Sequence, residues 1–569
     1  MRKVSYARLT LALLFLLMLW LALALHAISG WLSLAPAALF VGLVFYHERL
    51  RRAYDRAKRS VVFYERGLDR LENRWQGKGS PGTEYLNPAH LYATDLDILG
   101  NASLFELLST VGTRSGEETL ARWLCQPATR EEILTRQQAV HELRDAIDLR
   151  EDLFLIGRQV RSEVHPSFMS AWARDPVRLE SMVARVIAPL LVALLVIAIV
   201  YSLTPGGSNV PLLSVLAVES AYGLYYRSRV QEVIRTIDEP VRELRILGAA
   251  LRRIESETYS SERLRALQEN LSGGKRRPSQ EIAYLIRLFD YMNQRRNEFF
   301  AIFSFVMLWG TQFSFAIEAW RRRCGPEIDS WLQNFGEFET LCALAGYACE
   351  HPEEPFPEIV EGTAVLEGED LRHPLMPASA CVPNSIHLGG ELRLLLVSGS
   401  NMSGKSTLLR TVGINVALAQ AGGPVRAKRM RLSVLAIGAT LRVQDSLQAG
   451  VSRFYAEIQR LHDTMELTSG KLPVLFLLDE ILHGTNSHDR AIGAEAIVRG
   501  LMERGAIGLV TTHDLALTRF ADALGPRAKN VHFQDQLENG RMTFDYVLHD
   551  GVVQKSNALE LMRAVGLRV

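Results

Sequence analysis

The sequence predicts two kinds of structure in one chain: an α-helical N-terminal part that contains two apolar hairpins, and a C-terminal α/β domain with a mainly parallel sheet. Short continuous apolar runs, such as residues 474–478, are typical of strands buried on both faces of a parallel sheet. A glycine-rich loop follows another such run, and apolar runs of about twenty residues predict the hairpins. With 569 residues, the chain exceeds a single hydrophobic core and is expected to form several domains.

The glycine-rich loop follows residues 392–398 and fits the phosphate-binding pattern G-x-x-x-x-G-K-[ST] at every fixed position. Its residues are Gly399, Ser400, Asn401, Met402, Ser403, Gly404, Lys405, Ser406 and Thr407. In this pattern backbone N–H groups and the N-terminus of the next helix surround a phosphate, while Lys405 reaches the outer phosphates and Ser406 binds Mg²⁺. A chance match in a Gly/Ser-rich loop is the alternative. The apolar run before the loop and the helical segment after it favour a nucleotide site.

An acidic pair, Asp479 and Glu480, follows the buried run 474–478. We expect Asp479 to hold Mg²⁺ through water and Glu480 to orient or deprotonate the water that attacks the phosphate. Residues 506–512 predict another buried strand, and His513 follows it at a place suited to sensing the γ-phosphate. A lone histidine after a strand is more often structural, but the two preceding motifs favour a functional role.

These segments together resemble the ATPase domain of the MutS mismatch-repair family. The likeness rests on GSNMSGKST, LLDEILHGTNSHD and TTHD in this order, and on the core-like residues 95–145. It implies an ABC-type P-loop enzyme that binds and hydrolyses ATP with Mg²⁺. Residues 445–454 resemble the family's signature segment, so the resemblance implies a homodimer in which Ser452 completes the partner's nucleotide site. Cys381 stands where relatives often carry an aromatic side chain that stacks on adenine.

The resemblance also implies double-stranded DNA as a partner, as in mismatch repair. Lys and Arg (64) nearly balance Asp and Glu (63), so no overall basic field favours nucleic acid, and a DNA contact would need a local patch. We expect no mismatch-recognition domain before the core, and we interpret Phe63-Tyr64-Glu65 as a chance match to the wedge tripeptide of such domains. The five cysteines show neither zinc spacing nor a disulfide pattern, which fits a reducing compartment.

The first apolar hairpin is predicted from residues 9–28 and 31–46. Residues 9–28 carry no ionisable side chain other than His26 and are long enough to span a bilayer. A cleaved signal peptide is the alternative, but the length of the run and the second run after it favour an anchor. Basic residues flank both ends of the pair, so both ends are expected in the cytoplasm.

The second hairpin is predicted from residues 186–203 and 210–226, joined by a turn rich in proline and glycine. Basic residues again place both ends in the cytoplasm. Glu219 lies inside the second run, where a carboxylate marks either a function or a satisfied helix contact. Residues 299–317 are a further apolar region that polar residues interrupt. We expect a buried or interfacial helix there rather than a fifth span.

The expected organisation is therefore a multi-pass cell-membrane protein with four transmembrane helices and cytoplasmic core and ATPase domains. Residues 1–60 form the first hairpin, 61–90 a linker, 91–345 a helical core with the second hairpin inserted, and 346–569 the ATPase domain. Residues 230–269 are expected to form one long lever helix. The expected function is a DNA-associated, membrane-anchored ATPase. The alternatives are a mechanochemical or transport-coupled membrane ATPase that binds no DNA, and a nucleotide-gated scaffold with negligible hydrolysis.

Overall fold

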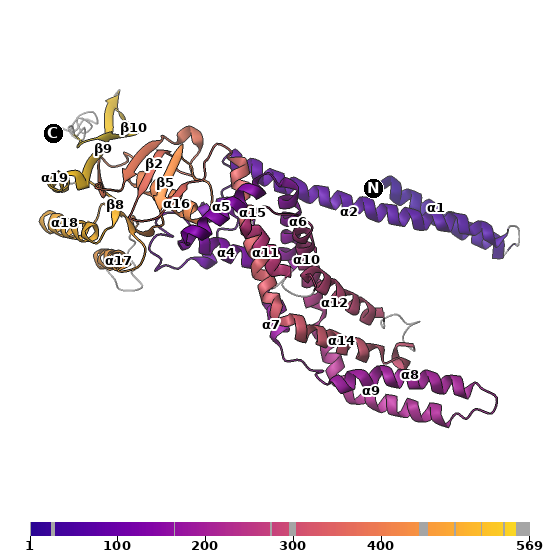
Figure 1. Cartoon of the computed structure of the whole chain (residues 1–569). Coiled ribbons are helices and arrows are strands. Elements are labelled where there is room, and N and C mark those ends of the chain that lie inside the picture. Colours follow the sequence, from indigo (N-terminus) through magenta and orange to yellow (C-terminus); the bar gives the residue numbers. More distant parts are fainter. Residues whose placement is uncertain are drawn as a thin grey trace. The chain divides into compact units, whose positions relative to one another are not determined.

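The computed structural model describes residues 2–23, 25, 29–163, 166–272, 276–294, 303–442, 453–482, 485–513, 515–538 and 541–553. It divides the chain into two units, residues 1–72 and 73–569. The first unit is a pair of helices, α1 (Arg2–Leu23) and α2 (Leu34–Leu71), with the 3-10 helix η1 (Gly30–Ser33) before α2 (Figure 1). Residues 61–71 continue α2 instead of forming part of a linker, and no proline between Pro36 and Pro81 breaks the helix there.

The second unit begins with a helical region that extends to Glu350. Several helices begin at a Ser or Thr whose hydroxyl accepts a backbone N–H bond, as Ser103, Thr113 and Thr129 do. The helices are α3 (Leu104–Leu108), α4 (Arg114–Cys125), α5 (Arg130–Arg144), α6 (Ile147–Glu163), α7 (Pro166–Arg174), α8 (Met182–Ser202), α9 (Val210–Thr236), α10 (Asp238–Glu255), α11 (Glu262–Ser272), α12 (Pro278–Asn293), α14 (Trp309–Cys324) and α15 (Ile328–Glu350); the 3-10 helices are η2 (Thr83–Tyr85) and η4 (Gly325–Glu327).

The prediction of one lever helix over residues 230–269 is wrong. The chain leaves α9 at Thr236, forms α10 and then α11, and the polar segment 256–261 separates the last two. Pro240 lies in the first turn of α10, where its missing N–H costs nothing, and it cannot donate into a helix that continues from α9. Residues 309–317 belong to α14, whose inner face is buried as expected, while residues 299–302 lie outside the described residues.

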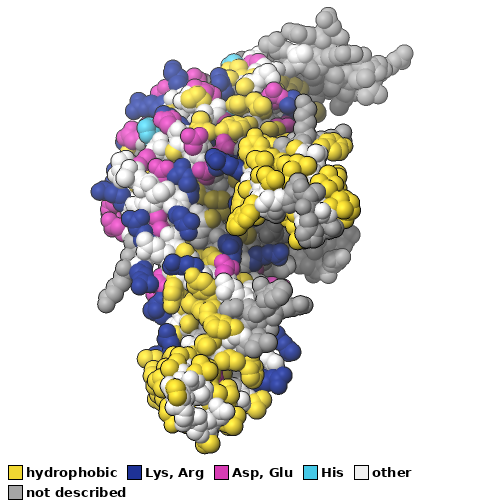
Figure 2. Space-filling view, turned by 90° about the vertical axis from the view of Figure 1, so that its right-hand side faces the viewer, with side chains coloured by type: hydrophobic (Ala, Val, Ile, Leu, Met, Phe, Trp, Pro, Cys, Tyr) yellow, Lys and Arg dark blue, Asp and Glu magenta, His cyan; other side chains and the backbone are white. Residues whose placement is uncertain are grey.

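Helices α8 and α9 form the second hairpin, with the turn where the sequence predicts it. Its inner side packs on α14, and Ala188, Leu191 and Leu308 form a small apolar cluster there. Its outer side is apolar and exposed; Val183, for example, is 70% exposed. Figure 2 shows apolar side chains gathered over the end of this hairpin, at the bottom of the view.

Three helices in the described part of the chain are long and apolar enough to cross a membrane: Tyr6–Leu23, Trp31–Leu71 and Met182–Ser202. Helix α9, the fourth expected span, is not among them. It carries Glu219 within its apolar half and basic residues from Arg227 onward, and these side chains lower its mean hydropathy.

The C-terminal α/β domain contains two sheets rather than one. The six-stranded sheet has the order β10-β9-β4-β8-β7-β6 and is parallel except for the β10–β9 pair. The four-stranded sheet has the order β1-β5-β2-β3, and only its β1–β5 pair is parallel. The prediction of a mainly parallel sheet therefore describes the six-stranded sheet and does not include the four-stranded sheet. The strands are β1 (Glu358–Val360), β2 (Leu366–Leu371), β3 (Asn384–Leu388), β4 (Leu394–Ser398), β5 (Arg429–Ser433), β6 (Ala436–Thr440), β7 (Val474–Asp479), β8 (Ile507–Thr512), β9 (Ala528–Glu538) and β10 (Arg541–Asp550).

Helices cover both faces of the six-stranded sheet. Helix α16 (Lys405–Ala421) lies on one face, and its buried side chains join a core that continues into the helical region through α4 and α5. Helices α17 (Arg453–Leu467), α18 (Ser487–Glu503) and α19 (Leu515–Ala523) enclose a separate core on the other face. Because one core spans α16 and the helical region, a displacement of α16 is transmitted to the helices packed on it.

Candidate nucleotide site

The phosphate-binding pattern forms the turn between β4 and α16, as the sequence predicts for such a loop. Gly399, Met402 and Gly404 have φ angles of 154°, 68° and 102°. At Gly404 a Cβ atom would lie 3.2 Å from the ring of Tyr546, so the position favours glycine by both conformation and space. The loop thus turns its backbone toward the N-terminus of α16, where a helix attracts anions.

The buried polar groups of the loop suit a polyphosphate. Within the described structure, the hydroxyl oxygens of Ser400 and Ser403 are buried without a hydrogen-bond partner. Lys405 is buried, and its Nζ donates to the carbonyl oxygens of Gly399 (2.9 Å) and Ser400 (2.8 Å). An ammonium group and two hydroxyls in one closed loop provide the charge and the donors that phosphate oxygens require.

Asp479 is the last residue of β7, Glu480 follows it, and Thr511 of β8 forms hydrogen bonds with both. The Thr511 hydroxyl donates to Asp479 Oδ1 (2.5 Å) and accepts from the backbone N–H of Glu480 (3.0 Å). Glu480 has a φ of 48°, an unfavourable conformation for a side chain of this size. The turn directs its carboxylate toward the loop, where Glu480 Oε1 lies 3.4 Å from Lys405 Nζ.

His513 contacts the same carboxylate oxygen from the end of β8. Its Nδ1 lies 3.5 Å from Glu480 Oε1, and its side chain is 42% exposed. One carboxylate oxygen therefore lies between an ammonium and an imidazole. A carboxylate held in this way can accept a proton from a water molecule, while the imidazole stays partly exposed to solvent.

Lys405, Asp479 and Glu480 line a cavity of about 770 Å³. Ser406 and Asp479 both face it and offer the hard oxygen ligands that Mg²⁺ prefers, so the donor set fits that ion. Asn401, Met402 and Thr407 also line the cavity, so the loop contributes to its wall along most of its length.

The wall beyond the phosphate loop is formed by Cys381, Val382, Phe533 and Tyr546. Tyr546 was missed by sequence reasoning because no motif contains it. It has a φ of 55° and lies where the β9–β10 register shifts, between Phe544 and Leu548. Asn384 fixes this bulge: its Nδ2 donates to the Tyr546 carbonyl (3.0 Å), and its Oδ1 accepts from the Leu548 N–H (2.7 Å). The only signal in the sequence is the pair of aromatic residues at alternate positions of this strand.

His373 supports the part of the cavity wall that contains Cys381. Its backbone N–H donates to Cys381 Sγ (3.2 Å), and its Nδ1 accepts from the Leu375 N–H (3.2 Å). The side chain is 6% exposed, and burial lowers its pKa to about 4. The imidazole is therefore neutral in the folded protein at neutral pH, which its role as a hydrogen-bond acceptor requires.

A buried aspartate joins the helical region to this site. Asp95 is 1% exposed; it accepts from the N–H groups of Leu441 (3.2 Å) and Arg442 (2.6 Å) and pairs with Arg460 of α17. Burial raises its pKa despite these partners. Arg410 of α16 donates to the Asp95 carbonyl (3.1 Å). The segment around Asp95 therefore contacts the helix that begins at the phosphate loop.

Asp95 also holds the chain immediately before the predicted signature segment. Ser452 lies outside the described residues, as does most of residues 445–454, so its predicted contact with a partner subunit stays a prediction.

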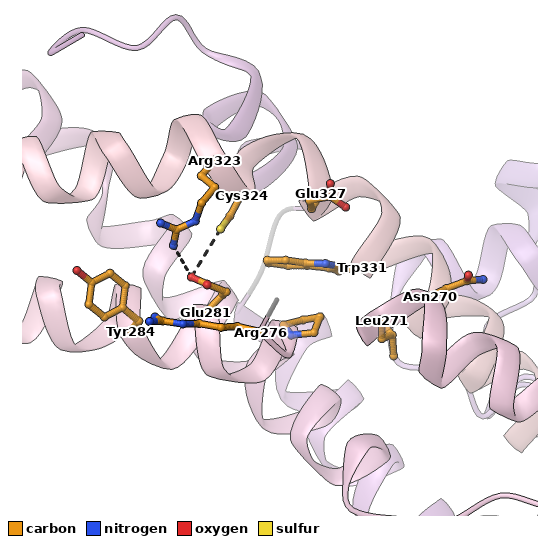
Figure 3. A pocket seen from close by; sticks show the side chains of 10 residues that line it. Asn270, Leu271, Arg276, Glu281, Tyr284, Arg323, Cys324, Glu327 and Trp331 are labelled. Atoms are coloured by element: carbon orange, nitrogen blue, oxygen red, sulfur yellow. Dashed lines mark hydrogen bonds and ion pairs between the residues drawn. The ribbon is translucent and has the colours of Figure 1, made fainter. Parts of the chain in front are cut away.

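The helical region has a cavity of its own, of about 630 Å³, between α11, α12, α14 and α15 (Figure 3). Arg323 and Cys324 of α14 point toward Glu281 of α12, at 2.6 Å and 3.8 Å from its Oε2. Trp331 extends into the cavity from α15. The Glu281 carboxylate is thus already paired within the protein.

Comparison with known proteins agrees with the geometry of the nucleotide site. Residues 395–568 match MutS domain V. The endonuclease MutS2 of Thermus thermophilus is 37% identical over 196 residues, which cover 34% of this chain and 25% of that protein. The DNA mismatch repair protein MutS of Geobacillus kaustophilus is 31% identical over 249 residues, which cover 42% of this chain and 27% of that protein. The match therefore spans about a quarter of the length of these relatives.

Proposed function

We propose that this chain, whose residues 395–568 match MutS domain V, is a membrane-anchored ATPase that hydrolyses ATP with Mg²⁺. One observation carries the hydrolytic role: Glu480 Oε1 lies 3.4 Å from Lys405 Nζ and 3.5 Å from His513 Nδ1, at the mouth of the phosphate loop. A site that only binds nucleotide needs the lysine but not a carboxylate directed at the outer phosphate.

Each residue then has a separate task. Lys405 leaves the carbonyls of its own loop to bind the outer phosphates, and Ser400 and Ser403 donate their unpartnered hydroxyls to phosphate oxygens. Ser406 and Asp479 hold Mg²⁺, which neutralises charge on the phosphate oxygens when bound. Glu480 orients the attacking water and accepts its proton. His513 contacts the outer phosphate and reports its loss to Glu480.

The proposed anchor is supported by the exposed apolar surfaces of α1, α2 and α8. The topology is tested with single cysteines at Ser29 and Ser208 in a protein whose five native cysteines are replaced by serine. Ser208 is preferable to its neighbour Gly207, where a Cβ would lie 2.1 Å from the Tyr201 carbonyl oxygen. We expect both to react only from the outside, whereas a cysteine at the exposed Ser469 reacts only from the cytoplasmic side. Labelling of Ser29 or Ser208 from the cytoplasm would contradict the topology.

We further propose that the chain works as a homodimer on double-stranded DNA, because the relatives carry the names DNA mismatch repair protein and endonuclease. The test is ATP turnover of the detergent-solubilised protein with and without double-stranded DNA, over a salt series. We expect stimulation that falls as salt rises, because phosphate contacts release counterions. ATP turnover that is the same with and without DNA at every salt concentration would contradict the DNA role.

The dimer is tested separately by subunit mixing. A Lys405→Ala subunit lacks its own phosphate contact but keeps Ser452, and a Ser452→Ala subunit has the reverse defect. We expect the mixture to recover activity at one of its two sites. Mixed subunits that stay as inactive as each variant alone would contradict completion of one site by the other subunit.

A second candidate function is a membrane ATPase coupled to a load within the bilayer, without DNA. One observation favours it: Glu219 of the α8–α9 hairpin is a buried carboxylate that lines a cavity. Turnover that is indifferent to DNA but changes with the lipid or ligand supplied to this hairpin would select it.

A further inference from the structure

Glu219 is a buried carboxylate whose charge nothing in the described structure compensates. Its side chain is 4% exposed, and neither carboxylate oxygen has a hydrogen-bond partner. Two other buried carboxylates of the helical region have partners within the chain. Glu339 accepts N–H bonds from Gly112 (3.1 Å) and Thr113 (3.2 Å), and Glu318 pairs with Arg321 at 2.9 Å. Since an unpaired buried carboxylate is costly, Glu219 favours a cationic partner, and no described residue provides one.

Glu219 lines a cavity of about 480 Å³, which is large enough for a small organic ligand. The cavity lies between α9 and the segment that leads into α14. Most of its wall is apolar, from Leu216, Leu224, Val230, Ile234, Phe305, Val306 and Leu308. Gly223 and Gly310 contribute no side chain to the wall, and Ser220, Gln231, Ser304 and Thr311 add neutral polar groups.

Among the described residues of this wall one is basic, and it lies too far along α9 to neutralise Glu219. Arg227 lies two turns farther on, about 12 Å along the helix axis at 1.5 Å per residue. No ion pair joins the two side chains in the described structure. The cavity therefore presents a carboxylate at one place and an apolar surface around it.

We propose that this cavity binds an apolar organic cation, with an ammonium group on the Glu219 carboxylate and an apolar body against the leucine and valine side chains. A neutral apolar ligand would leave the carboxylate unpaired, and an anion would be repelled. The ligand is either an amine-bearing lipid or a free hydrophobic amine, since both offer the same chemistry. The inference goes beyond the proposed ATPase function, and its test measures binding rather than turnover.

The test compares decyltrimethylammonium with decyl sulfate, two probes with the same alkyl chain and opposite head charge. The full-length protein in an uncharged maltoside detergent is heated with each probe below its micellar concentration. We expect the cation to raise the melting temperature of the wild type by about 2–5 °C, because a ligand that binds the folded state stabilises it. We expect no rise with decyl sulfate.

Two variants locate the effect. Glu219→Gln keeps the shape of the side chain and removes its charge, and we expect it to lose the rise. Gly223→Leu keeps the carboxylate but fills the cavity, since a Cβ there meets only Leu308 Cδ2 at 3.4 Å, and it should lose the rise as well. Glu239→Gln removes an exposed carboxylate of α10 outside the cavity and should behave as the wild type.

Three outcomes would overturn the proposal: no rise in the wild type, an equal rise with decyl sulfate, or an equal rise in Glu219→Gln. If the proposal holds, bilayers identify the source of the ligand. Stabilisation in vesicles that contain phosphatidylethanolamine over vesicles of phosphatidylglycerol alone, lost in Glu219→Gln, assigns the ligand to a lipid amine. Stabilisation by the free amine alone assigns it to a soluble ligand.

Discussion

The nucleotide site and the α8–α9 hairpin each place a carboxylate in a cavity, and they surround it in opposite ways. Glu480 has a lysine and a histidine within 3.5 Å and is 25% exposed. Glu219 is 4% exposed and has no partner in the described structure. The α/β domain thus surrounds Glu480 with basic side chains of its own, whereas we propose that another molecule provides the countercharge of Glu219. Burial alone does not distinguish a catalytic carboxylate from a ligand-binding carboxylate. The side chains around each carboxylate distinguish them.

The largest expected effect is on turnover by Glu480→Gln. The amide cannot accept the proton of the attacking water, so we expect ATP turnover to fall by about 10²–10⁴-fold while nucleotide binding persists. Steady-state turnover and equilibrium nucleotide binding measure the two separately. Glu391→Gln, at an exposed position of the same domain, is the control. Equal turnover in Glu480→Gln and wild type would remove the base assignment and favour the nucleotide-gated scaffold.

Lys405→Ala tests the cationic partner of Glu480. Loss of the ammonium removes charge-assisted bonds to phosphate, so we expect about 100-fold weaker ATP binding. A fluorescent ATP analogue measures the affinity, and Lys428→Ala provides a control that removes a lysine outside the cavity. Unchanged affinity in Lys405→Ala would mean that the loop does not bind phosphate.

His373 extends the comparison to pH. Its pKa is about 4 in the folded protein against 6.5 for a free imidazole, because burial disfavours the charge. The unfolded chain therefore binds a proton first as pH falls. The stability from this group is complete above pH 6.5 and is lost between pH 6.5 and 4, by up to about 3 kcal/mol.

His373→Asn keeps an oxygen acceptor near the position of Nδ1 without a titratable group. Urea unfolding of the wild type and the variant at pH 7 and pH 5 measures how far the free energy of unfolding of each protein changes with pH. Glu339 acts in the opposite direction, since burial raises its pKa to about 7 and its contribution falls as pH rises from 4.5 to 7. Both proteins contain Glu339, so its contribution cancels when the pH dependence of the variant is subtracted from that of the wild type. Identical pH dependence in the two proteins would contradict the assignment to His373.

Glu219→Leu tests the other side of the comparison in the absence of ligand. Replacing an unpaired buried carboxylate with an apolar side chain should raise the free energy of unfolding by about 1–2 kcal/mol. The same change at Glu339 should lower it, because Gly112 and Thr113 would lose their acceptor. Denaturant unfolding in detergent measures both. A loss of stability in Glu219→Leu would show that Glu219 has a structural partner.

The smallest expected effect is that of Tyr546→Ala. The ring lines the cavity beside Gly404, and its loss should weaken nucleotide binding by about 3–10-fold through lost packing. Tyr546→Phe should bind as the wild type does, because the ring remains. If Tyr546→Ala and wild type bind equally well, the base does not contact this wall.

Residues fixed by local chemistry were predictable from the sequence. The phosphate loop, the acidic pair and the turn of the second hairpin depend on glycines, carboxylates and apolar runs that are adjacent in the chain. These segments lie where strands β4, β7 and β8 and helices α8 and α9 place them.

Residues fixed by contacts distant in sequence were not predictable. Tyr546 lines the cavity from a bulge of β10 whose backbone Asn384, 162 residues earlier, binds. The four-stranded sheet pairs β1 with β5, between which three strands and α16 intervene in the chain. The length of α2 and the break between α9 and α10 depend on where a pattern stops, which hydrophobic periodicity marks poorly. Membrane insertion, DNA binding and the role of Ser452 stay predictions.

The side chain of Asn384 affects how fast the backbone of strands β3 and β10 opens to solvent. It belongs to β3 of the four-stranded sheet and binds backbone groups of β10 in the six-stranded sheet, directly beside the nucleotide cavity. Strand β10 lies at the edge of its sheet, where backbone amides exchange readily with solvent deuterium. A nucleotide that rests on Tyr546 would slow amide exchange in β3 and β10 together, although the two strands belong to different sheets. Exchange rates in these two strands would then fall and rise with each cycle of nucleotide binding and release.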